Sequence, residues 1–408
     1  MPRENLIVAL DVGTDKVATL VAVQDETGLK YVGKGVADNE SGMIAGNVVN
    51  LEATSSAIRN SVAQAEKVSS KIIKSVYVSI SGEQIRSTSG RGVVTIRGSE
   101  VAQVDIDNVI SQAMTLNISG DREIVNVEIG EFVVDGRTGI RNPKGMACKK
   151  LEVEVLILTA SMTMLRNLVK AVEDAKLQVA GLLVSGIASS WAVLEEDEKK
   201  LGVALVDIGG GSADIAIYSK GDPIFTASVP LGGRNITNDI SRVLKIPPQE
   251  AEKIKCDKGD VNSENIPETE EVDVIEIGTN KSCKKKVRQL SAVLTPRVEE
   301  ILIEVKKRLQ ESRKENMIQT NVVITGGTAN LKNIEQLASE IFEQPVRIGR
   351  PNVDEKGTGF QDVLCSTSFS TAVGMVNYFA SRDRVVFAKE SESIISKIIN
   401  YLKQLFIL

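Results

Sequence analysis

Two short segments of the chain place an aspartate, glycines and a hydroxyl residue in an order that suits phosphate binding. In the first, the apolar run 6–10 leads into Asp11-Val12-Gly13-Thr14-Asp15-Lys16. In the second, the apolar run 203–206 leads into Asp207-Ile208-Gly209-Gly210-Gly211-Ser212. Each segment continues into a second alternating strand, so both are predicted to be strand–turn–strand hairpins. Glycines at the tip of such a hairpin let backbone N–H groups approach a polyphosphate, because no Cβ atom blocks them.

The two hairpins lie half a chain apart, which favours a nucleotide site shared by two halves of the molecule. A single hairpin of this kind is most often an ordinary turn, but two copies are hard to obtain by chance. Asp11 and Asp207 are expected to face a Mg²⁺ ion through bound water, because this ion prefers oxygen ligands and retains several waters. A third segment, 322–329, again runs from a strand into a Gly-Gly turn, which suits contact with a base or ribose.

The composition excludes several kinds of chemistry. The 408 residues include no histidine, which rules out histidine acid–base catalysis, histidine metal sites and a Ser-His-Asp triad. A net charge of −5 gives no overall basic character of the kind that binds nucleic acid, so none is expected as a partner. The four cysteines are widely spaced and are interpreted as free thiols in a reducing compartment.

Residues 28–35 imitate a different phosphate-binding motif. They have the G-x-x-x-x-G-K spacing of a P-loop, but position 35 is glycine where a Mg²⁺-binding Ser or Thr is required. No helix start follows, so we predict a strand of the first sheet here.

The three glycine-containing segments resemble the phosphate-1, phosphate-2 and adenosine motifs of the actin/Hsp70/sugar-kinase ATPase superfamily. Within it, the chain resembles the FtsA family of bacterial cell-division proteins over nearly its whole length. The resemblance implies an α/β, actin-like two-lobed ATPase fold with two inserted subdomains and a C-terminal amphipathic helix. It also implies ATP and Mg²⁺ as ligands. At most slow ATPase activity is expected, because no residue that would orient the attacking water is identifiable.

The resemblance implies a nucleotide site built from five segments. Its residues are Asp11, Gly13, Thr14 and Lys16 on the first hairpin, Asp207, Gly209, Gly210, Gly211 and Ser212 on the second, Gly232, Gly233, Asn235 and Thr237 on a glycine turn and the following helix, Glu252 and Lys255 on a further helix, and Gly326, Gly327 and Thr328 on the adenosine turn. Taken alone, Glu252 and Lys255 at i, i+3 spacing would be an ordinary surface salt bridge.

Changes of pattern along the chain, together with the resemblance, divide it into six parts. These are subdomain 1A (1–81 and 161–199), inserted subdomain 1C (82–160), subdomain 2A (200–234 and 311–380), inserted subdomain 2B (235–310), a charged linker (381–392) and an amphipathic helix (393–408).

Three local features within these parts are predicted from composition and spacing. We expect separate strands at 123–128 and 131–134 and a long helix over 291–312, with Pro296 early in it. We also expect the charged stretch 256–286 to be irregular and solvated.

The segment 393–408 carries an apolar stripe at helical spacing. The stripe consists of Ile394, Ile395, Ile398, Ile399, Leu402, Leu405 and Phe406. A helix of about fifteen residues spans about 22 Å, which is too short for a hydrocarbon core of about 30 Å, so it would lie in a membrane interface. Lys397 and Lys403 would favour an anionic surface. The alternative is a helix packed on the protein's own core.

Two functions from different classes fit these features. The favoured one is an actin-like ATP-binding cell-division protein that assembles on the inner face of the cytoplasmic membrane and tethers the FtsZ ring to it. The alternative is a soluble ATPase of the same superfamily, a metabolite kinase or a chaperone-like protein, without a membrane role. Neither a secretion signal nor a spanning segment is apparent, so we expect a cytoplasmic protein, peripheral on the membrane at the division site.

The favoured function implies several partners. The FtsZ C-terminal peptide would bind at positions that match Arg288, Arg297 and Glu300. For these three residues, an ordinary solvated helix face is the alternative. The chain would also bind itself in a filament, the anionic membrane surface, and later division proteins through subdomain 1C.

Overall fold

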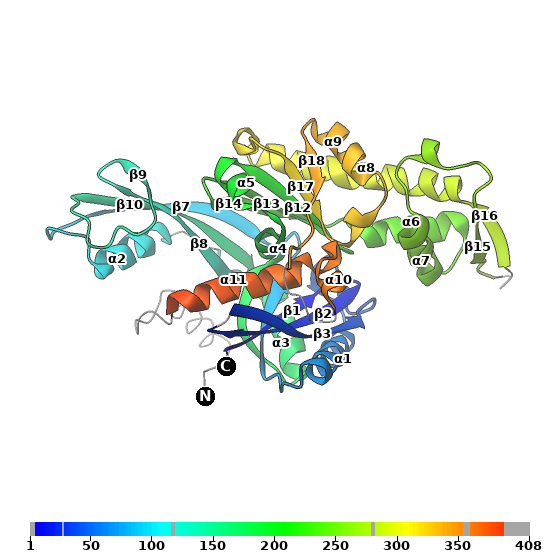
Figure 1. Ribbon diagram of the computed structural model, residues 1–408, viewed down its shortest axis with the longest axis horizontal. Coiled ribbons are helices and arrows are strands. Elements are labelled where there is room, and N and C mark those ends of the chain that lie inside the picture. Colours follow the sequence, from blue (N-terminus) through cyan, green and yellow to red (C-terminus); the bar gives the residue numbers. More distant parts are fainter. Residues whose placement is uncertain (1–4, 27, 116–118, 279–281, 354–359, 387–408) are drawn as a thin grey trace.

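The structure is a computed structural model that describes residues 5–26, 28–115, 119–278, 282–353 and 360–386. Two five-stranded sheets form the centres of two lobes (Figure 1). Both sheets follow one plan, in which an antiparallel meander of three strands is extended by two parallel strands. The repeated hairpin motif of the sequence is therefore part of a larger repeated architecture.

The first lobe is built on the strands in the order β11 (Gln178–Val184), β6 (Ser75–Ile80), β1 (Asn5–Val12), β2 (Lys16–Asp25) and β3 (Gly28–Asp38). Helix α1 (Leu51–Ser69) packs on β2 and β3, and α3 (Met162–Asp174) packs beside α1.

The P-loop-like segment is part of strand β3, as predicted. A Cβ atom at Gly35 would lie 1.9 Å from the carbonyl oxygen of Ser61 in α1. Glycine here therefore permits close packing of a helix on a strand, rather than an approach to phosphate.

The second lobe is built on the strands in the order β14 (Asp222–Val229), β13 (Ala213–Ser219), β12 (Val203–Ile208), β17 (Val322–Thr325) and β18 (Val346–Ile348). Strand β12 is buried along its whole length, as expected for a central strand covered on both faces. Its side chains alternate between two apolar cores, because successive residues of a strand point to opposite faces. One core contains helices α8 (Val287–Glu311) and α9 (Ile334–Phe342), and the other contains α4 (Ser185–Val193).

Helices α4 and α11 (Ser370–Val386) pack against each other between the two sheets (Figure 1). They cross closely, because a Cβ atom at Gly374 would lie only 1.8 Å from the carbonyl oxygen of Ala188. Helix α11 continues to Val386, so residues 381–386 of the expected linker are helical. The expected amphipathic helix 393–408 lies outside the described residues. In the part of the chain that the structure describes, no helix is long and apolar enough to cross a membrane.

The first insertion has its own sheet, in the order β7 (Arg86–Thr95), β10 (Lys150–Ser161), β8 (Arg122–Val134) and β9 (Arg137–Ile140). Helix α2 (Gln103–Ala113) covers this sheet and completes a separate apolar core. The two strands expected at 123–128 and 131–134 are one strand, β8. The alternation of side chains along β8 is interrupted where its pairing with β10 shifts register, between Val153 and Val155. The sequence pattern suggested a break between two strands here, but the strand continues through the shift.

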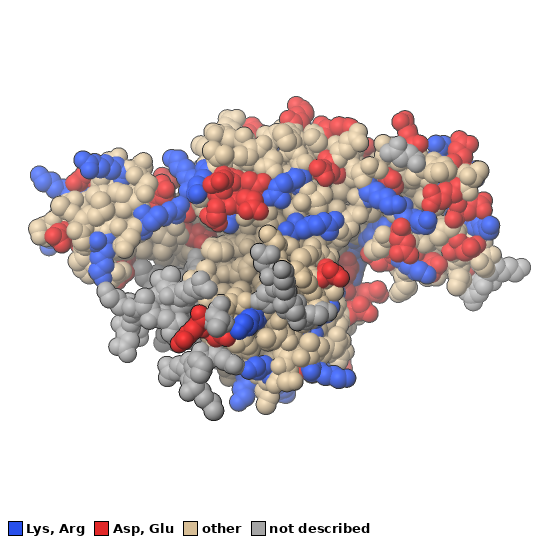
Figure 2. Space-filling view, viewed as in Figure 1, with Lys and Arg blue, Asp and Glu red and all other residues tan. Residues whose placement is uncertain are grey.

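The second insertion contains α6 (Gly233–Leu244), α7 (Pro248–Lys258), a hairpin of β15 (Glu271–Ile275) and β16 (Ser282–Lys286), and the start of α8. Part of the stretch expected to be irregular is therefore ordered. Glu271 and Lys284 pair across the hairpin at 3.4 Å, so the opposite charges of the two strands support it. Charges of both signs cover this end of the molecule (Figure 2).

Helix α8 begins at Val287, four residues before the expected start. Pro296 is consequently in the helix interior rather than near its first turn, so its missing N–H leaves a backbone carbonyl without its usual helical donor. The hydroxyl of the preceding Thr295 donates to the Ser291 carbonyl oxygen at 2.8 Å. This side-chain hydrogen bond lies beside the position where the proline interrupts the helical hydrogen bonds.

Candidate nucleotide-binding cleft

The tips of the β1–β2 and β12–β13 hairpins have the same turn. In the first, the Gly13 N–H donates to the Lys16 carbonyl oxygen at 2.9 Å; in the second, the Gly209 N–H donates to the Ser212 carbonyl oxygen at 2.9 Å. The strand flanking each turn is fixed by a full antiparallel ladder. The sequence repeat therefore produces two hairpins of the same local geometry, one in each lobe.

The two hairpin tips meet across the lobes. A Cβ atom at Gly210 would lie 1.8 Å from Oδ2 of Asp15, and one at Gly211 would lie 2.2 Å from Oγ1 of Thr14. A side chain at Gly211 would press on Cβ of Thr14, and one at Gly210 would displace the carboxylate of Asp15. The glycines of the second hairpin therefore let the first hairpin approach its backbone.

Two carboxylates, that of the half-buried Asp11 and that of the buried Asp207, lie behind the tips. Asp11, at the end of β1, accepts a hydrogen bond from Oγ of Ser79 at 2.7 Å. Asp207 accepts from the hydroxyl of Ser189 in α4 and from Oγ1 of Thr371 in α11, the latter at 3.1 Å. Burial raises the pKa of Asp11, and it raises the pKa of Asp207 to about 6. Both shifts show that the ionised carboxylates are poorly solvated.

Lys16 supplies positive charge to this region. Its ammonium group interacts with the charges of Asp11, Asp15 and Asp207, while burial lowers its pKa. The Lys16 ammonium also lies 4.7 Å from the ring centre of Phe369. The half-buried Asp11, the buried Asp207 and the half-buried Lys16 together suit a divalent cation, which would stabilise the ionised carboxylates. The two carboxylates therefore fit Mg²⁺. The glycine backbone of the hairpin tips, which side chains would obstruct, fits a polyphosphate.

The glycine turn before α6 is joined directly to the second hairpin. The Gly233 N–H donates to the Gly209 carbonyl oxygen at 2.9 Å. Oδ1 of Asn235 accepts from the Gly232 N–H at 2.9 Å, so Asn235 satisfies a backbone donor at the start of the helix. A Cβ atom at Gly232 would lie 2.6 Å from the Gly209 carbonyl oxygen, so this position requires glycine for close packing.

Glu252 and Lys255 of α7 face the same turn. Nζ of Lys255 donates to Glu252 at 2.7 Å, to Oγ1 of Thr237 at 2.9 Å and to the Gly233 carbonyl oxygen at 3.1 Å. Lys255 is 5 % exposed, so this pair is not a simple solvent-exposed salt bridge. The hydrogen bonds of Lys255 to Thr237 and to the Gly233 carbonyl oxygen therefore join the pair to the glycine turn and the helix that follows it.

The Gly326–Thr328 turn completes the cleft from the other side. Gly326 has a φ of 89°, and a Cβ atom there would lie 2.4 Å from Oδ1 of Asp207. Oγ1 of Thr328 donates to the Gly209 carbonyl oxygen at 3.3 Å. At Gly327 no atom lies within 4 Å of a Cβ position, so that glycine faces open space. All five segments expected to form the site therefore converge around the second hairpin.

Four residues of this region were not among the sequence-derived site residues. Ser79, Ser189 and Thr371 hold the carboxylates by hydrogen bonds. Ser79 interrupts an apolar strand, but Ser189 and Thr371 lie beside further hydroxyl residues, so local composition does not single them out. Asp214 lies opposite Asp207 in the β12–β13 ladder, and burial raises its pKa to about 7. An aspartate within the apolar strand β13 was a signal that could have indicated it.

Of the three residues expected to bind a partner peptide, two line one cavity. Arg297 and Glu300 line a cavity of about 410 Å³ beside α6 and α8, together with Asp239, Arg242 and Val243. Arg288 is not among the lining residues. Its side chain instead donates to the Ile266 carbonyl oxygen at 2.7 Å and to Glu268 at 3.0 Å.

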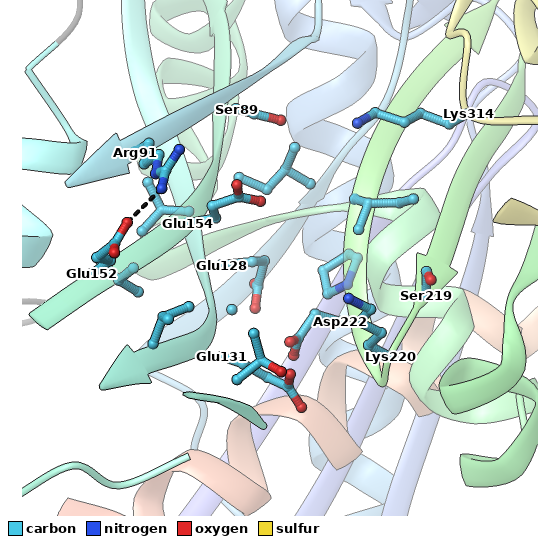
Figure 3. A pocket seen from close by; sticks show the side chains of 18 residues that line it. Ser89, Arg91, Glu128, Glu131, Glu152, Glu154, Ser219, Lys220, Asp222 and Lys314 are labelled. Atoms are coloured by element: carbon cyan, nitrogen blue, oxygen red, sulfur yellow. Dashed lines mark hydrogen bonds and ion pairs between the residues drawn. The ribbon is translucent and has the colours of Figure 1, made fainter. Parts of the chain in front are cut away.

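A second cavity, of about 250 Å³, lies between the sheet of the first insertion and the second lobe (Figure 3). Ser219, at the far end of β13, lines it, but none of the candidate nucleotide-site residues does. Glu128, Glu131, Glu152 and Asp222 converge there, and Arg91 pairs with Glu152. This cavity marks the contact of the insertion with the second lobe, rather than the nucleotide cleft.

The chain matches two family descriptions. Residues 204–374 match "Cell division protein FtsA", and residues 82–159 match "SHS2 domain inserted in FTSA". Among relatives, the cell division protein FtsA of Pseudomonas aeruginosa is 36 % identical over 374 residues, which cover 91 % of this chain and 89 % of that protein.

Solved structures share the fold at low sequence identity. The PilM–PilN type IV pilus biogenesis complex gives a TM-score of 0.64 at 14 % identity, covering 92 % of this chain and 98 % of that chain. MreB 5 of Spiroplasma citri bound to AMPPNP gives 0.55 at 15 % identity, covering 95 % and 99 %. These similarities confirm the expected actin-like α/β fold. From its identity to relatives over nearly its whole length, the chain belongs to the FtsA family of cell-division proteins.

Proposed function

We propose that this protein binds ATP with Mg²⁺ between its two lobes. The observation that carries the proposal is the meeting of two hairpins with the same turn, each following an aspartate whose pKa is raised. The AMPPNP complex of the similarly folded MreB 5 supports the choice of nucleotide. Bound Mg²⁺ would neutralise phosphate charge, and Asp11 and Asp207 would hold its water ligands.

The residues around the hairpins have distinct roles in this proposal. Ser189 and Thr371 orient Asp207, and Ser79 orients Asp11. The Lys255–Glu252 pair and the Gly326–Thr328 turn would border the base and ribose. Because the groups around the nucleotide come from both lobes, binding of ATP would favour the arrangement in which the two lobes lie close together. The proposal includes at most slow hydrolysis, since no side chain is assigned to orient water.

The decisive test of nucleotide binding is calorimetry with ATP and Mg²⁺ on the full chain. Asp207→Asn, which keeps the side-chain size and removes the charge, should weaken binding at least tenfold, which corresponds to about 1.4 kcal/mol. Asp174→Asn, at the exposed end of α3, is the matched control and should bind as the wild type does. Unchanged affinity in Asp207→Asn would refute the assigned site.

We further propose that the cavity beside α6 and α8 binds the FtsZ C-terminal peptide. It combines apolar side chains with charges of both signs, as a short peptide with mixed chemistry requires. Val243 is 61 % exposed there although it is apolar, and Val293 and Pro296 also line the cavity. Arg297 is held by Asp239 at 2.6 Å, so its guanidinium has a fixed position beside the apolar wall.

Fluorescence anisotropy with a labelled FtsZ C-terminal peptide tests this assignment. Val243→Asp should weaken binding at least tenfold, because it places a charge on the apolar wall of the cavity. Arg288→Ala should leave binding within about twofold, because Arg288 does not line the cavity. The reverse pattern would mean that the peptide binds near Arg288 and the β15–β16 hairpin instead.

The remaining proposed roles are filament assembly and attachment to the inner face of the cytoplasmic membrane at the division site. Attachment is supported by the apolar stripe of residues 393–408. Filament assembly would place many such segments on one surface, which multiplies a weak single affinity. Later division proteins are proposed to bind through the first insertion. Co-sedimentation with anionic vesicles, with and without residues 393–408, tests attachment; equal binding by both forms would mean that this segment does not attach the protein to the membrane.

A further inference from the structure

Arg234 contacts both phosphate hairpins. Its backbone N–H donates to the carbonyl oxygen of Gly210, in the second hairpin, at 2.7 Å. Its side chain crosses to the first hairpin, where Nε donates to Oδ1 of Asp15 at 2.7 Å and Nη2 donates to the Thr14 carbonyl oxygen at 2.8 Å. A single residue thus joins the two tips that the proposed nucleotide site requires to face each other.

The guanidinium is fixed by further acceptors of the first lobe. Nη1 of Arg234 donates to the carbonyl oxygens of Glu40 at 2.7 Å and Met43 at 3.4 Å. The Arg234 side chain is only 23 % exposed. A planar guanidinium offers five donors in a rigid arrangement, so several acceptors in one region hold it in a defined position.

The carboxylate of Asp15, with which Arg234 pairs, lies at the tip of the first hairpin, where a negative charge opposes phosphate binding. The Asp15 Oδ2 atom is 1.8 Å from the position of a Cβ atom at Gly210, so it lies directly against the glycine backbone of the second hairpin. Lys16 already interacts with the charges of Asp11, Asp15 and Asp207. Lys16 and a bound Mg²⁺ would act mainly on Asp11, Asp207 and the phosphates. The carboxylate of Asp15, whose side chain is 41 % exposed, would therefore still repel a polyphosphate unless another cation pairs with it.

We propose that Arg234 is a positioning residue of the nucleotide site. By pairing with Asp15, it compensates the carboxylate charge so that the polyphosphate is admitted, and it fixes the spacing of the two hairpins. The inference rests on the proposed binding of ATP and adds an electrostatic requirement to it. No residue of α6 beyond the glycine turn, Asn235 and Thr237 was otherwise assigned to the site.

Calorimetry on the full chain, with ATP plus Mg²⁺ and separately with AMP, tests the proposal. Arg234→Ala should weaken ATP binding at least tenfold and AMP binding much less, because the uncompensated charge of Asp15 acts mainly on the additional phosphates. Adding Asp15→Asn should restore most of the ATP affinity. Arg308→Ala is the control, because it removes an arginine that pairs with Glu311 at 2.9 Å on the surface of α8. It should bind ATP as the wild type does.

The double variant separates charge compensation from a purely mechanical link. If Arg234 only ties the hairpins together, the double variant lacks the link as well, and ATP binding stays as weak as in Arg234→Ala. That result would overturn the proposal. If Arg234→Ala does not fold, Asp15→Asn alone decides: ATP affinity at or above that of the wild type supports the proposal, and a tenfold loss contradicts it. A wild-type protein that binds no ATP would instead refute the proposed function itself.

Discussion

Adjacent glycines in the adenosine turn offer a sharp test of the cleft geometry. Gly326 has a φ of 89°, and a Cβ atom there would lie 2.4 Å from Oδ1 of Asp207 and 2.5 Å from the Ile208 carbonyl oxygen. Gly327, the next residue, has open space at its Cβ position. Gly326→Ala should therefore destabilise the protein without ligand, and Gly327→Ala should leave that protein nearly unchanged.

The magnitude follows from two contributions. Alanine at a positive φ with a ψ of 170°, a region almost restricted to glycine, costs about 1–3 kcal/mol. Forcing an additional carbon against a backbone oxygen and a buried carboxylate costs about 1–3 kcal/mol more. The sum of about 2–6 kcal/mol should lower the melting temperature of the protein by on the order of 10 °C. The change expected for Gly327→Ala is within about 0.5 kcal/mol.

Thermal unfolding of both variants, with and without ATP and Mg²⁺, measures this prediction. Displacement of Asp207 should also reduce the stabilisation that ligand gives to Gly326→Ala. A Gly327→Ala protein that is normal without ligand but less stabilised by ATP would place the nucleotide in the open space beside that residue. The reasoning about the turn is refuted if Gly326→Ala melts at the wild-type temperature.

Three other expected outcomes test separate parts of the molecule. Gly210→Val should weaken ATP binding more than tenfold in calorimetry, because its side chain would occupy the space against Asp15; wild-type affinity would contradict the contact between the hairpins. Replacing residues 82–160 by a short linker should leave ATP affinity within about threefold, because that range contains no candidate nucleotide residue; loss of binding in a folded protein would invalidate the domain boundaries. Ile398→Glu should abolish co-sedimentation of the protein with vesicles and leave ATP affinity unchanged, because a charge in a membrane-buried helix costs up to about 2.5–3.5 kcal/mol. Normal co-sedimentation would mean that the segment packs on the protein instead.

Local sequence patterns predicted the two hairpins, whereas the actin-like two-lobed fold was predicted from the family resemblance. The two hairpins follow from apolar alternation interrupted by Asp and Gly, because strand pairing across a short turn depends on neighbouring residues. The glycine at position 35 was enough to exclude a P-loop, and the segment is indeed strand β3. The strand pattern failed at residues 123–134, where pairing with β10 keeps one strand continuous through an irregularity.

Contacts between segments far apart in sequence were decided by the tertiary structure. Arg288 and Arg297 lie on one helix, α8, yet only Arg297 lines the cavity beside α6. Which face of a helix meets a partner depends on the packing of the second element, and spacing along one helix does not contain that information.

The sequence by itself determined that two aspartate–glycine hairpins exist, and the match to relatives agrees with the family that they indicated. The tertiary structure decided that the tips touch, that hydroxyls of α4 and α11 hold Asp207, and that Arg234 joins both hairpins. The physical reason is that hairpin formation is a local property of the chain. A cross-lobe hydrogen bond instead requires side-chain directions and distances that only the complete packing of two sheets defines.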